Sequence, residues 1–144
     1  MYPSIRHYMT TPPRFIPADE TVFRARQMMQ ALSLRHLPVV EGDRLVGVVT
    51  ERDMRMLEGC GASSLMTPVR DAMTPEPYSV DVSSPVAQVA RAMAERKLGS
   101  AVVTDNGRIV GIFSSTDALR LLAEIFDEYF SAPTSDRWGN EVQR

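Results

Sequence analysis

The chain has 144 residues, of which 44% are apolar and 24% charged, and its formal net charge at pH 7 is −2. These are ordinary globular values, and a domain of this length buries roughly 68–70% of its unfolded surface. The small net charge excludes the broad positive field that holds nucleic acid, and no stretch approaches the ~20 apolar residues of a membrane span. We therefore expect a cytoplasmic protein with no nucleic-acid partner and no membrane span.

The sequence repeats itself after 64 residues. Residues 5–57 align without a gap on residues 69–121, with identities such as Gly47 with Gly111. This period is longer than the roughly 20–50 residues of a solenoid unit, so two copies predict one domain with two-fold pseudosymmetry. The expected organisation is repeat 1 over 5–58, a connector over 59–68, repeat 2 over 69–130 and a tail over 131–144.

Repeat 1 alternates between strand and helix signals. Asp19 is a good N-cap for a helix whose apolar residues recur at helical spacing, and Gly42 marks a hairpin turn between two apolar runs. Gly59 is suited to end the last helix. The expected elements are a strand over 15–17, a helix from Asp19 to about Leu32, strands over 37–40 and 45–49, and a helix from Thr50 to about Glu58.

Repeat 2 gives the same order of elements. Ser83 is the predicted N-cap, Pro85 suits the first helical turn, and Asn106-Gly107 is a strong hairpin signal. The unit is therefore β-α-β-β-α, used twice in an α+β fold. Each copy alone would leave one sheet face in water, so we expect the copies to pack face to face. The later elements are strands over 101–103 and 109–113 and a helix that continues to Phe130.

The pattern G-h-h-[ST]-x-x-[DN] occurs once in each repeat, at the point where the second strand meets a helix. Backbone N–H groups at a helix start favour anions, and Thr50 and Ser114 carry hydroxyls that can bind a phosphate or cap the helix. Asp53 and Asp117 lie in the first helical turn, from which a carboxylate can accept hydrogen bonds from a ribose diol. The glycine of each pattern allows close backbone approach.

This doubled motif resembles the nucleotide-contacting motif of CBS domains, and the resemblance covers about residues 5–125. Met9-Thr10, Met73-Thr74 and the segment 37–40 fit the flanking pieces of that family. The resemblance implies a tandem pair, or Bateman module, with a regulatory role and no required cofactor. It implies AMP, ADP or ATP as the default ligand, bound in the cleft between the repeats to modulate an unidentified protein. S-adenosylmethionine, NAD and cyclic dinucleotides occur in related proteins.

The candidate ligand-binding residues differ between the repeats. Near the first motif lie Arg35, His36 and Arg52, whose counterparts are Gly99, Ser100 and Thr116, so two unequal sites are expected. Apolar side chains before and within the strands are candidates to sandwich a flat base. The full set is Thr50, Arg52, Asp53, Ser114, Thr116, Asp117, Ile16, His36, Pro38, Val80, Ser100 and Val102.

Other interpretations of these residues stay open. Thr and Asp at a helix start are often plain caps, and His36 is nearly as well explained as a partly buried spacer. The alternatives to a nucleotide sensor are a ligand-free structural dimerisation module and a sensor of S-adenosylmethionine or another adenosyl ligand. An enzyme is not expected, because the sequence has no Ser-His-Asp order, P-loop or metal cluster, and its one cysteine, Cys60, forms no disulfide or CxxC pair.

The last helix is apolar over a broad face that includes Leu122 and Phe126. One small core does not need so much apolar surface, and in the resembled family such helices pair two modules. We expect a homodimer with an isologous interface; the alternative is that Phe126 and Phe130 fold back on their own subunit. The polar tail after Phe130 is predicted to be flexible, with Trp138 as a possible anchor.

Overall fold

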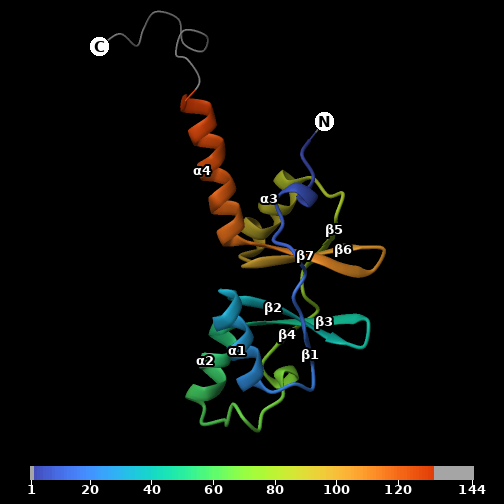
Figure 1. Cartoon of the computed structure of the whole chain (residues 1–144), viewed down its shortest axis with the longest axis vertical. Helices are drawn as coiled ribbons and strands as arrows, with labels where there is room; N and C mark the ends of the chain where they lie inside the picture. The colour runs from blue at the N-terminus through green and yellow to red at the C-terminus, as the bar shows by residue number, and fades with distance from the viewer. Residues whose placement is uncertain (1, 132–144) are drawn as a thin grey trace, which may run out of the picture.

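The computed structural model describes residues 2–131, which form two α+β halves stacked on each other (Figure 1). The predicted fold of two β-α-β-β-α repeats is confirmed. Ser131, the first residue of the predicted tail, is still helical, and the rest of that tail, Trp138 included, lies outside the described residues. None of the helices in the described part of the chain is long and apolar enough to cross a membrane.

The elements follow each other in the same order in both repeats. Repeat 1 contains β1 (Ile16–Pro17), α1 (Val22–Leu32), β2 (His36–Glu41), β3 (Arg44–Thr50) and α2 (Glu51–Gly59). Repeat 2 contains β5 (Ser79–Asp81), α3 (Val86–Arg96), β6 (Ser100–Asp105), β7 (Arg108–Ser114) and α4 (Ser115–Ser131). The first residues of the repeats form the short 3-10 helices η1 (Ile5–His7) and η2 (Val69–Asp71), and repeat 2 adds the strand β4 (Thr74–Pro75) before β5.

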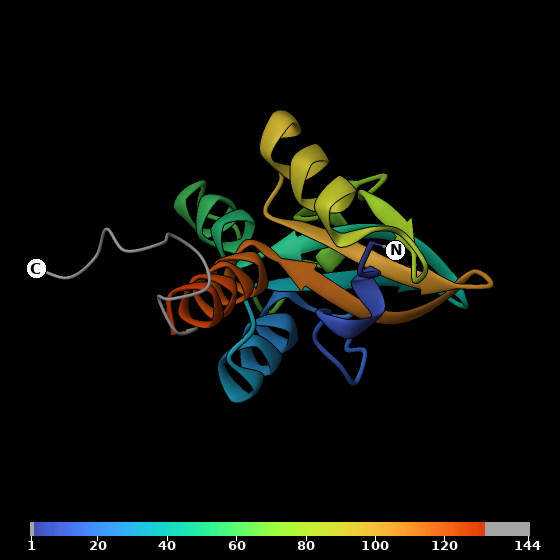
Figure 2. The same ribbon diagram turned by 90° about the horizontal axis from the view of Figure 1, so that it is seen from above.

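The two sheets repeat each other in backbone detail. In each repeat the hairpin strands are antiparallel and the first strand joins in parallel. The register of both hairpins shifts at the same place, after Val39 and after Val103. At the tip of the second hairpin, Asn106 and Gly107 both have positive φ, as a two-residue type I′ turn requires. Seen from above, both hairpin tips lie at one end of the molecule and α1, α2 and α4 at the other (Figure 2).

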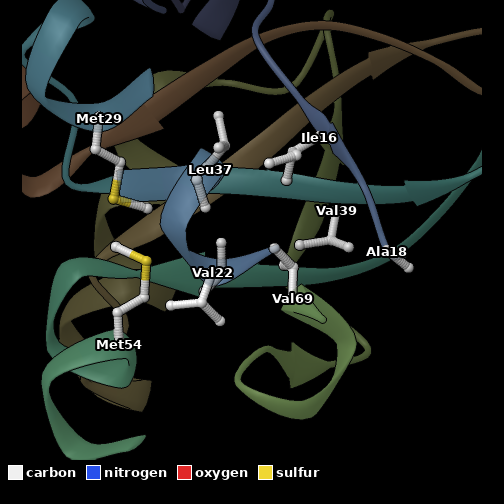
Figure 3. Close-up of a cluster of buried hydrophobic side chains, with 10 residues drawn as sticks. Ile16, Ala18, Val22, Met29, Leu37, Val39, Met54 and Val69 are labelled. Atoms are coloured by element: carbon white, nitrogen blue, oxygen red, sulfur yellow. The ribbon is translucent and has the colours of Figure 1, made fainter. Parts of the chain in front are cut away.

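Each repeat is completed by the first residues of the other repeat. Val69 is fully buried in the core of repeat 1, together with Ile16 and Val22 (Figure 3), and Ile5 is fully buried in the core of repeat 2. The strand β4 pairs with β3, and Thr10 forms a reciprocal bridge with Ile112 of β7. Neither repeat therefore has a complete core of its own, because the first residues of each repeat cross to the other repeat.

The predicted N-caps of α1 and α3 are wrong. Residues 17–20 form a turn closed by the bond from Glu20 N to Pro17 O, so α1 starts later, and Thr21 is its N-cap. Ser83 donates its backbone N–H and its hydroxyl to Asp81, and this local turn leaves Pro85 as the N-cap residue of α3. Asx-type turns compete with caps in this way.

Gly47 of β3 and Gly111 of β7 allow the first residues of each repeat to lie against the sheet of the other repeat. A Cβ at Gly111 would lie 2.7 Å from Sδ of Met9 and 2.9 Å from the carbonyl oxygen of Thr10. At Gly47 the corresponding distances, to Met73 and Thr74, are 2.5 Å and 2.9 Å. The close approach predicted for these glycines therefore exists, and in this structure the approaching groups are a methionine side chain and a threonine carbonyl.

Gly111→Ala should lower the free energy of unfolding by about 1–3 kcal/mol, because the new methyl group overpacks a contact with rigid backbone. Gly59→Ala is the matched control, since Gly59 ends α2 and a methyl group there would meet no packed neighbour within 4 Å among the described residues. That change should be neutral or stabilising by up to ~1 kcal/mol. Urea unfolding measures both, and equal effects of the two substitutions would contradict the packing argument.

Candidate functional site

The two strand-to-helix junctions are built in the same way. At the start of α2, Asp53 N donates to Thr50 Oγ1 and Thr50 N donates to Asp53 Oδ2, both at 3.0 Å. At the start of α4, Asp117 N donates to Ser114 Oγ at 3.2 Å and Ser114 N donates to Asp117 Oδ2 at 2.9 Å. Both carboxylates therefore cap their helices, and each uses one oxygen, Oδ2, to do so.

The second oxygen distinguishes the two carboxylates. Asp117 Oδ1 accepts a 2.8 Å hydrogen bond from Thr10 Oγ1 and lies 3.4 Å from a guanidinium nitrogen of Arg120. Asp117 is only 8% exposed. No hydrogen bond between described residues reaches Asp53 Oδ1, and Thr74, which corresponds to Thr10, makes none with its hydroxyl. Asp53 thus keeps one carboxylate oxygen without a hydrogen bond from the described residues. Asp117 uses both oxygens, and the second one contacts Thr10 near the N-terminus and Arg120 in α4.

A cleft of about 430 Å³ lies beside Asp117 and is walled by both repeats. Repeat 1 supplies the turn from α1 into β2, in which Ser33 has a left-handed φ of 54°, and repeat 2 supplies the junction of β7 and α4. We call this space the Asp117 cleft. The side chains that line it are Thr10, Leu32, Ser33, Leu34, Arg35, His36, Ile112, Ser114, Thr116, Asp117 and Arg120.

The Asp117 cleft has more basic than acidic groups. Arg35, His36 and Arg120 line it, whereas Asp117 is its one carboxylate. The guanidinium groups can bind a planar anion with two hydrogen bonds, and Thr116 adds a hydroxyl near the start of α4. The arrangement suits a ligand that carries a diol and a negative charge. Residues 2–131 contain no group of three or more His, Cys, Asp and Glu placed to hold a metal ion.

His36 stands between the two halves. It is the first residue of β2, where it pairs with Thr50, and its Nε2 atom would lie 2.6 Å from a Cβ at Gly99. Burial lowers the pKa of His36, the charge of Asp53 raises it to a lesser degree, and Arg35 adds a further lowering. The imidazole is therefore neutral at pH 7, and it contacts repeat 2 while it lines the Asp117 cleft.

The structure brings together only part of the predicted site. His36, Ser114, Thr116 and Asp117 line the Asp117 cleft. The other predicted residues do not line this cleft: Thr50, Asp53 and Ser100 are half-buried and Arg52 is exposed, whereas Ile16, Pro38, Val80 and Val102 pack in the interior.

The apolar residues that were predicted to sandwich a base do not line the Asp117 cleft. Ile16 is 1% exposed, and its side chain points into the core of repeat 1 (Figure 3), so in this structure it cannot sandwich a base. Val102 is also 1% exposed. The apolar side chains of the Asp117 cleft are Leu32, Leu34 and Ile112. A signal for one of them was present, because Ile112 is the first apolar residue after the glycine of the doubled motif.

Comparison with known proteins identifies the repeats. The CBS domain model matches residues 5–58 and 69–124. The uncharacterized protein YlbB of Bacillus subtilis is 32% identical over 116 residues, which are 78% of this chain and 78% of that protein. Inosine-5′-monophosphate dehydrogenase of Korarchaeum cryptofilum is 32% identical over 114 residues, but the match spans 78% of this chain and 22% of the dehydrogenase.

Solved structures give the same answer for the fold. The CBS domain pair of protein MJ0100, in complex with 5′-methylthioadenosine and S-adenosyl-L-methionine, superposes with a TM-score of 0.79 at 23% identity, covering 87% of this chain and 99% of that one. CBSX2 in complex with AMP gives a TM-score of 0.73 at 25% identity, covering 85% and 98%. From the matched repeats and this fold, the chain belongs to the CBS domain family and carries two CBS domains in tandem.

Proposed function

We propose that this chain is a regulatory module that binds AMP, ADP or ATP in the Asp117 cleft and thereby modulates a partner protein. One observation carries the proposal: a cleft walled by both repeats combines a buried carboxylate with three basic side chains. The ligands in the solved relatives, AMP in one and two adenosyl compounds in the other, support an adenosine-containing ligand. The partner, the absence of catalysis and the expected cytoplasmic location stay predictions.

The ribose would bind at Asp117 Oδ1, the oxygen that is not needed for the helix cap. A sugar hydroxyl competes there with Arg120, whose contact of 3.4 Å is long and whose side chain is 66% exposed. Because the contact is long and the guanidinium side of the pair is largely in water, we expect a sugar hydroxyl to replace it readily. Arg120 is then free to bind the phosphate together with Arg35, and the start of α4 adds its backbone N–H groups.

The charge of the cleft separates the candidate ligands. S-adenosylmethionine carries a positive sulfonium group, which the guanidinium charges of Arg35 and Arg120 disfavour, whereas they attract a nucleotide phosphate. The ligand-free structural module accounts for the capping bonds of Asp53 and Asp117. It gives no reason for a basic cleft around a buried carboxylate. These observations favour a phosphorylated adenosine.

Regulation follows from the position of the cleft between the repeats. A ligand that contacts Arg35 from repeat 1 and Asp117 from repeat 2 favours the arrangement in which both can bind it. The ligand can shift the equilibrium between two such arrangements only by the difference between its binding free energies for them, and a partner protein would respond to this shift. The short bond from Thr10 to Asp117 extends this coupling to the N-terminal segment.

AMP, ADP or ATP should raise the melting temperature of the protein, whereas S-adenosylmethionine at the same concentration should raise it less. A ligand at 100 times its Kd stabilises the native state by ~2.7 kcal/mol, which corresponds to roughly 5–10 °C for a chain of this size. Thermal-shift measurement with the four compounds makes the comparison. A melting temperature that none of them changes would favour the structural dimerisation module.

The two carboxylates should contribute unequally to nucleotide affinity. Asp117→Asn should weaken AMP binding by about 10–100-fold, since hydrogen bonds to a charged group contribute about 1.5–3 kcal/mol. Asp53→Asn, the change at the pseudosymmetric position, should have a much smaller effect because Asp53 does not line the Asp117 cleft. Calorimetric titration measures both, with circular dichroism to verify folding. Equal losses would show that the proposed asymmetry is wrong.

We propose further that α4 pairs two copies of the chain. From residue 122 to residue 131 every side chain is exposed, and α4 projects beyond the rest of repeat 2 (Figure 1). Phe126 and Phe130 stack on each other with centroids 5.9 Å apart, and neither folds back on its own subunit. So much exposed apolar surface is typical of an interface. The large apolar residues concerned are Leu119, Leu122, Ile125, Phe126, Tyr129 and Phe130.

Replacing both Leu122 and Phe126 with Asp should convert the dimer into a monomer, because the charges would have to be buried between two α4 helices. Sedimentation velocity measures the change. Met66→Asp is the matched control, since Met66 is 82% exposed but lies in the connector, and this variant should stay dimeric. An unchanged sedimentation coefficient for the double variant would argue against pairing through α4.

A further inference from the structure

His36 is the side chain through which the two repeats meet beside the Asp117 cleft. Its ring lines the cleft on one side, and its Nε2 atom packs against Gly99 of repeat 2. Any side chain at position 99 would collide with the ring, since even a Cβ would lie 2.6 Å from Nε2. The imidazole thus occupies a fixed place between the halves and within reach of whatever enters the cleft.

The charged groups around His36 come from three elements. Arg35 precedes it in the chain and opposes a positive charge on the ring, whereas Asp53 of α2 favours one. Across the cleft, α4 presents Asp117 and Arg120, which are paired with each other, and Gly99 presents no side chain. Burial is the largest influence and holds the pKa of His36 below its usual value. The free protein therefore keeps this histidine neutral at pH 7.

We propose that His36 takes up a proton when a phosphate-bearing ligand occupies the Asp117 cleft, so that binding of the phosphorylated ligand is coupled to pH. A phosphate group brings a charge of about −1.5 to −2 at pH 7. Beside it, a protonated imidazole is stabilised by the opposite charge and donates an N–H to a phosphate oxygen. This inference rests on the proposed nucleotide site and adds its regulation by protons.

The direction of the pH effect follows from linkage. If the complex holds one more proton than the separate molecules, affinity rises as the pH falls through the range between the pKa of free His36 and its higher value in the complex. For a shift of one pKa unit, the full gain in affinity is about tenfold once the pH lies below both values, and the range from pH 8 to pH 6 covers part of it. Adenosine, which lacks the phosphate, should lack this dependence. His36 would thereby help to distinguish nucleotides from nucleosides.

Calorimetric titration with AMP and with adenosine between pH 6 and pH 8 tests the proposal in the full chain. The phosphate of AMP titrates near pH 6 itself, so His36→Gln provides the reference curve. We expect the affinity of the wild type for AMP, and not for adenosine, to rise more steeply toward pH 6 than that of His36→Gln, by up to about tenfold. His7→Gln is the matched control, because His7 is the other histidine of the chain, is exposed on η1 and does not line the Asp117 cleft. This variant should behave as the wild type.

A second measurement does not require that His36→Gln folds. With two histidines in the chain, the proton NMR signal of each ring can be followed, and His7→Gln assigns them. Addition of AMP should raise the pKa of His36, and the His7 signals serve as the reference within the same spectrum. Gly99→Ala, which pushes the ring away from its present place, should reduce the effect of AMP on His36.

The outcomes separate the two proposals. AMP binding with the same pH dependence in the wild type and in His36→Gln, or an unchanged pKa of His36 in the AMP complex, would overturn the proton coupling and leave the nucleotide site standing. No AMP binding at any pH would overturn both. An equal pH dependence for adenosine and AMP would also overturn the coupling, because the phosphate would then not be its cause.

Discussion

The contact between each Met-Thr segment and a glycine of the other repeat is the constraint on which the rest of the structure depends. Met9 and Thr10 lie against Gly111, and Met73 and Thr74 lie against Gly47, at distances that leave no room for a Cβ. The same segments continue from Ile5 and Val69, which complete the opposite cores. The core of each repeat is thus completed by residues of the other repeat. This exchange holds the two repeats at a fixed distance, so the space between them is part of the fold.

Pseudosymmetry then provides two equivalent junctions, and side-chain differences give them different chemistry. Arg35 in one repeat corresponds to Gly99 in the other, and Arg120 corresponds to Met56. The two junctions therefore carry their basic groups at different positions, since Ser33 of the Asp117 cleft corresponds to Lys97 and Thr116 to Arg52. The bond from Thr10 adds a second difference, since Thr74 makes no such bond within residues 2–131. A duplicated scaffold can in this way keep its backbone and specialise one site, because charge is carried by side chains that do not determine the sheet register.

Helix capping and ligand binding are compatible roles for Asp117. Its Oδ2 atom accepts from Ser114 N and Ser114 Oγ, which fixes the start of α4, and its Oδ1 atom is directed to Thr10 and Arg120 at the cleft. A carboxylate has about four acceptor positions, so the cap does not exhaust it. The cap also restricts the carboxylate to one orientation. A group that is already oriented loses little entropy when a ligand binds, which is why a structural interaction can serve recognition.

The sequence alone determined the fold class, the order of the elements, the hairpins and the two strand-to-helix junctions with Asp53 and Asp117. These follow from local signals, namely apolar periodicity, turn residues and a motif repeated at a constant offset, and each acts within a few residues of the chain. Tertiary structure decided which residues meet across the repeats: Thr10 with Asp117, 107 positions apart, and His36 with Gly99. It also placed Ile16 in the core and Ile112 in the cleft. Such pairings arise because the first residues of each repeat pack into the other repeat. Local periodicity contains no information about which of the two repeats a segment will pack against.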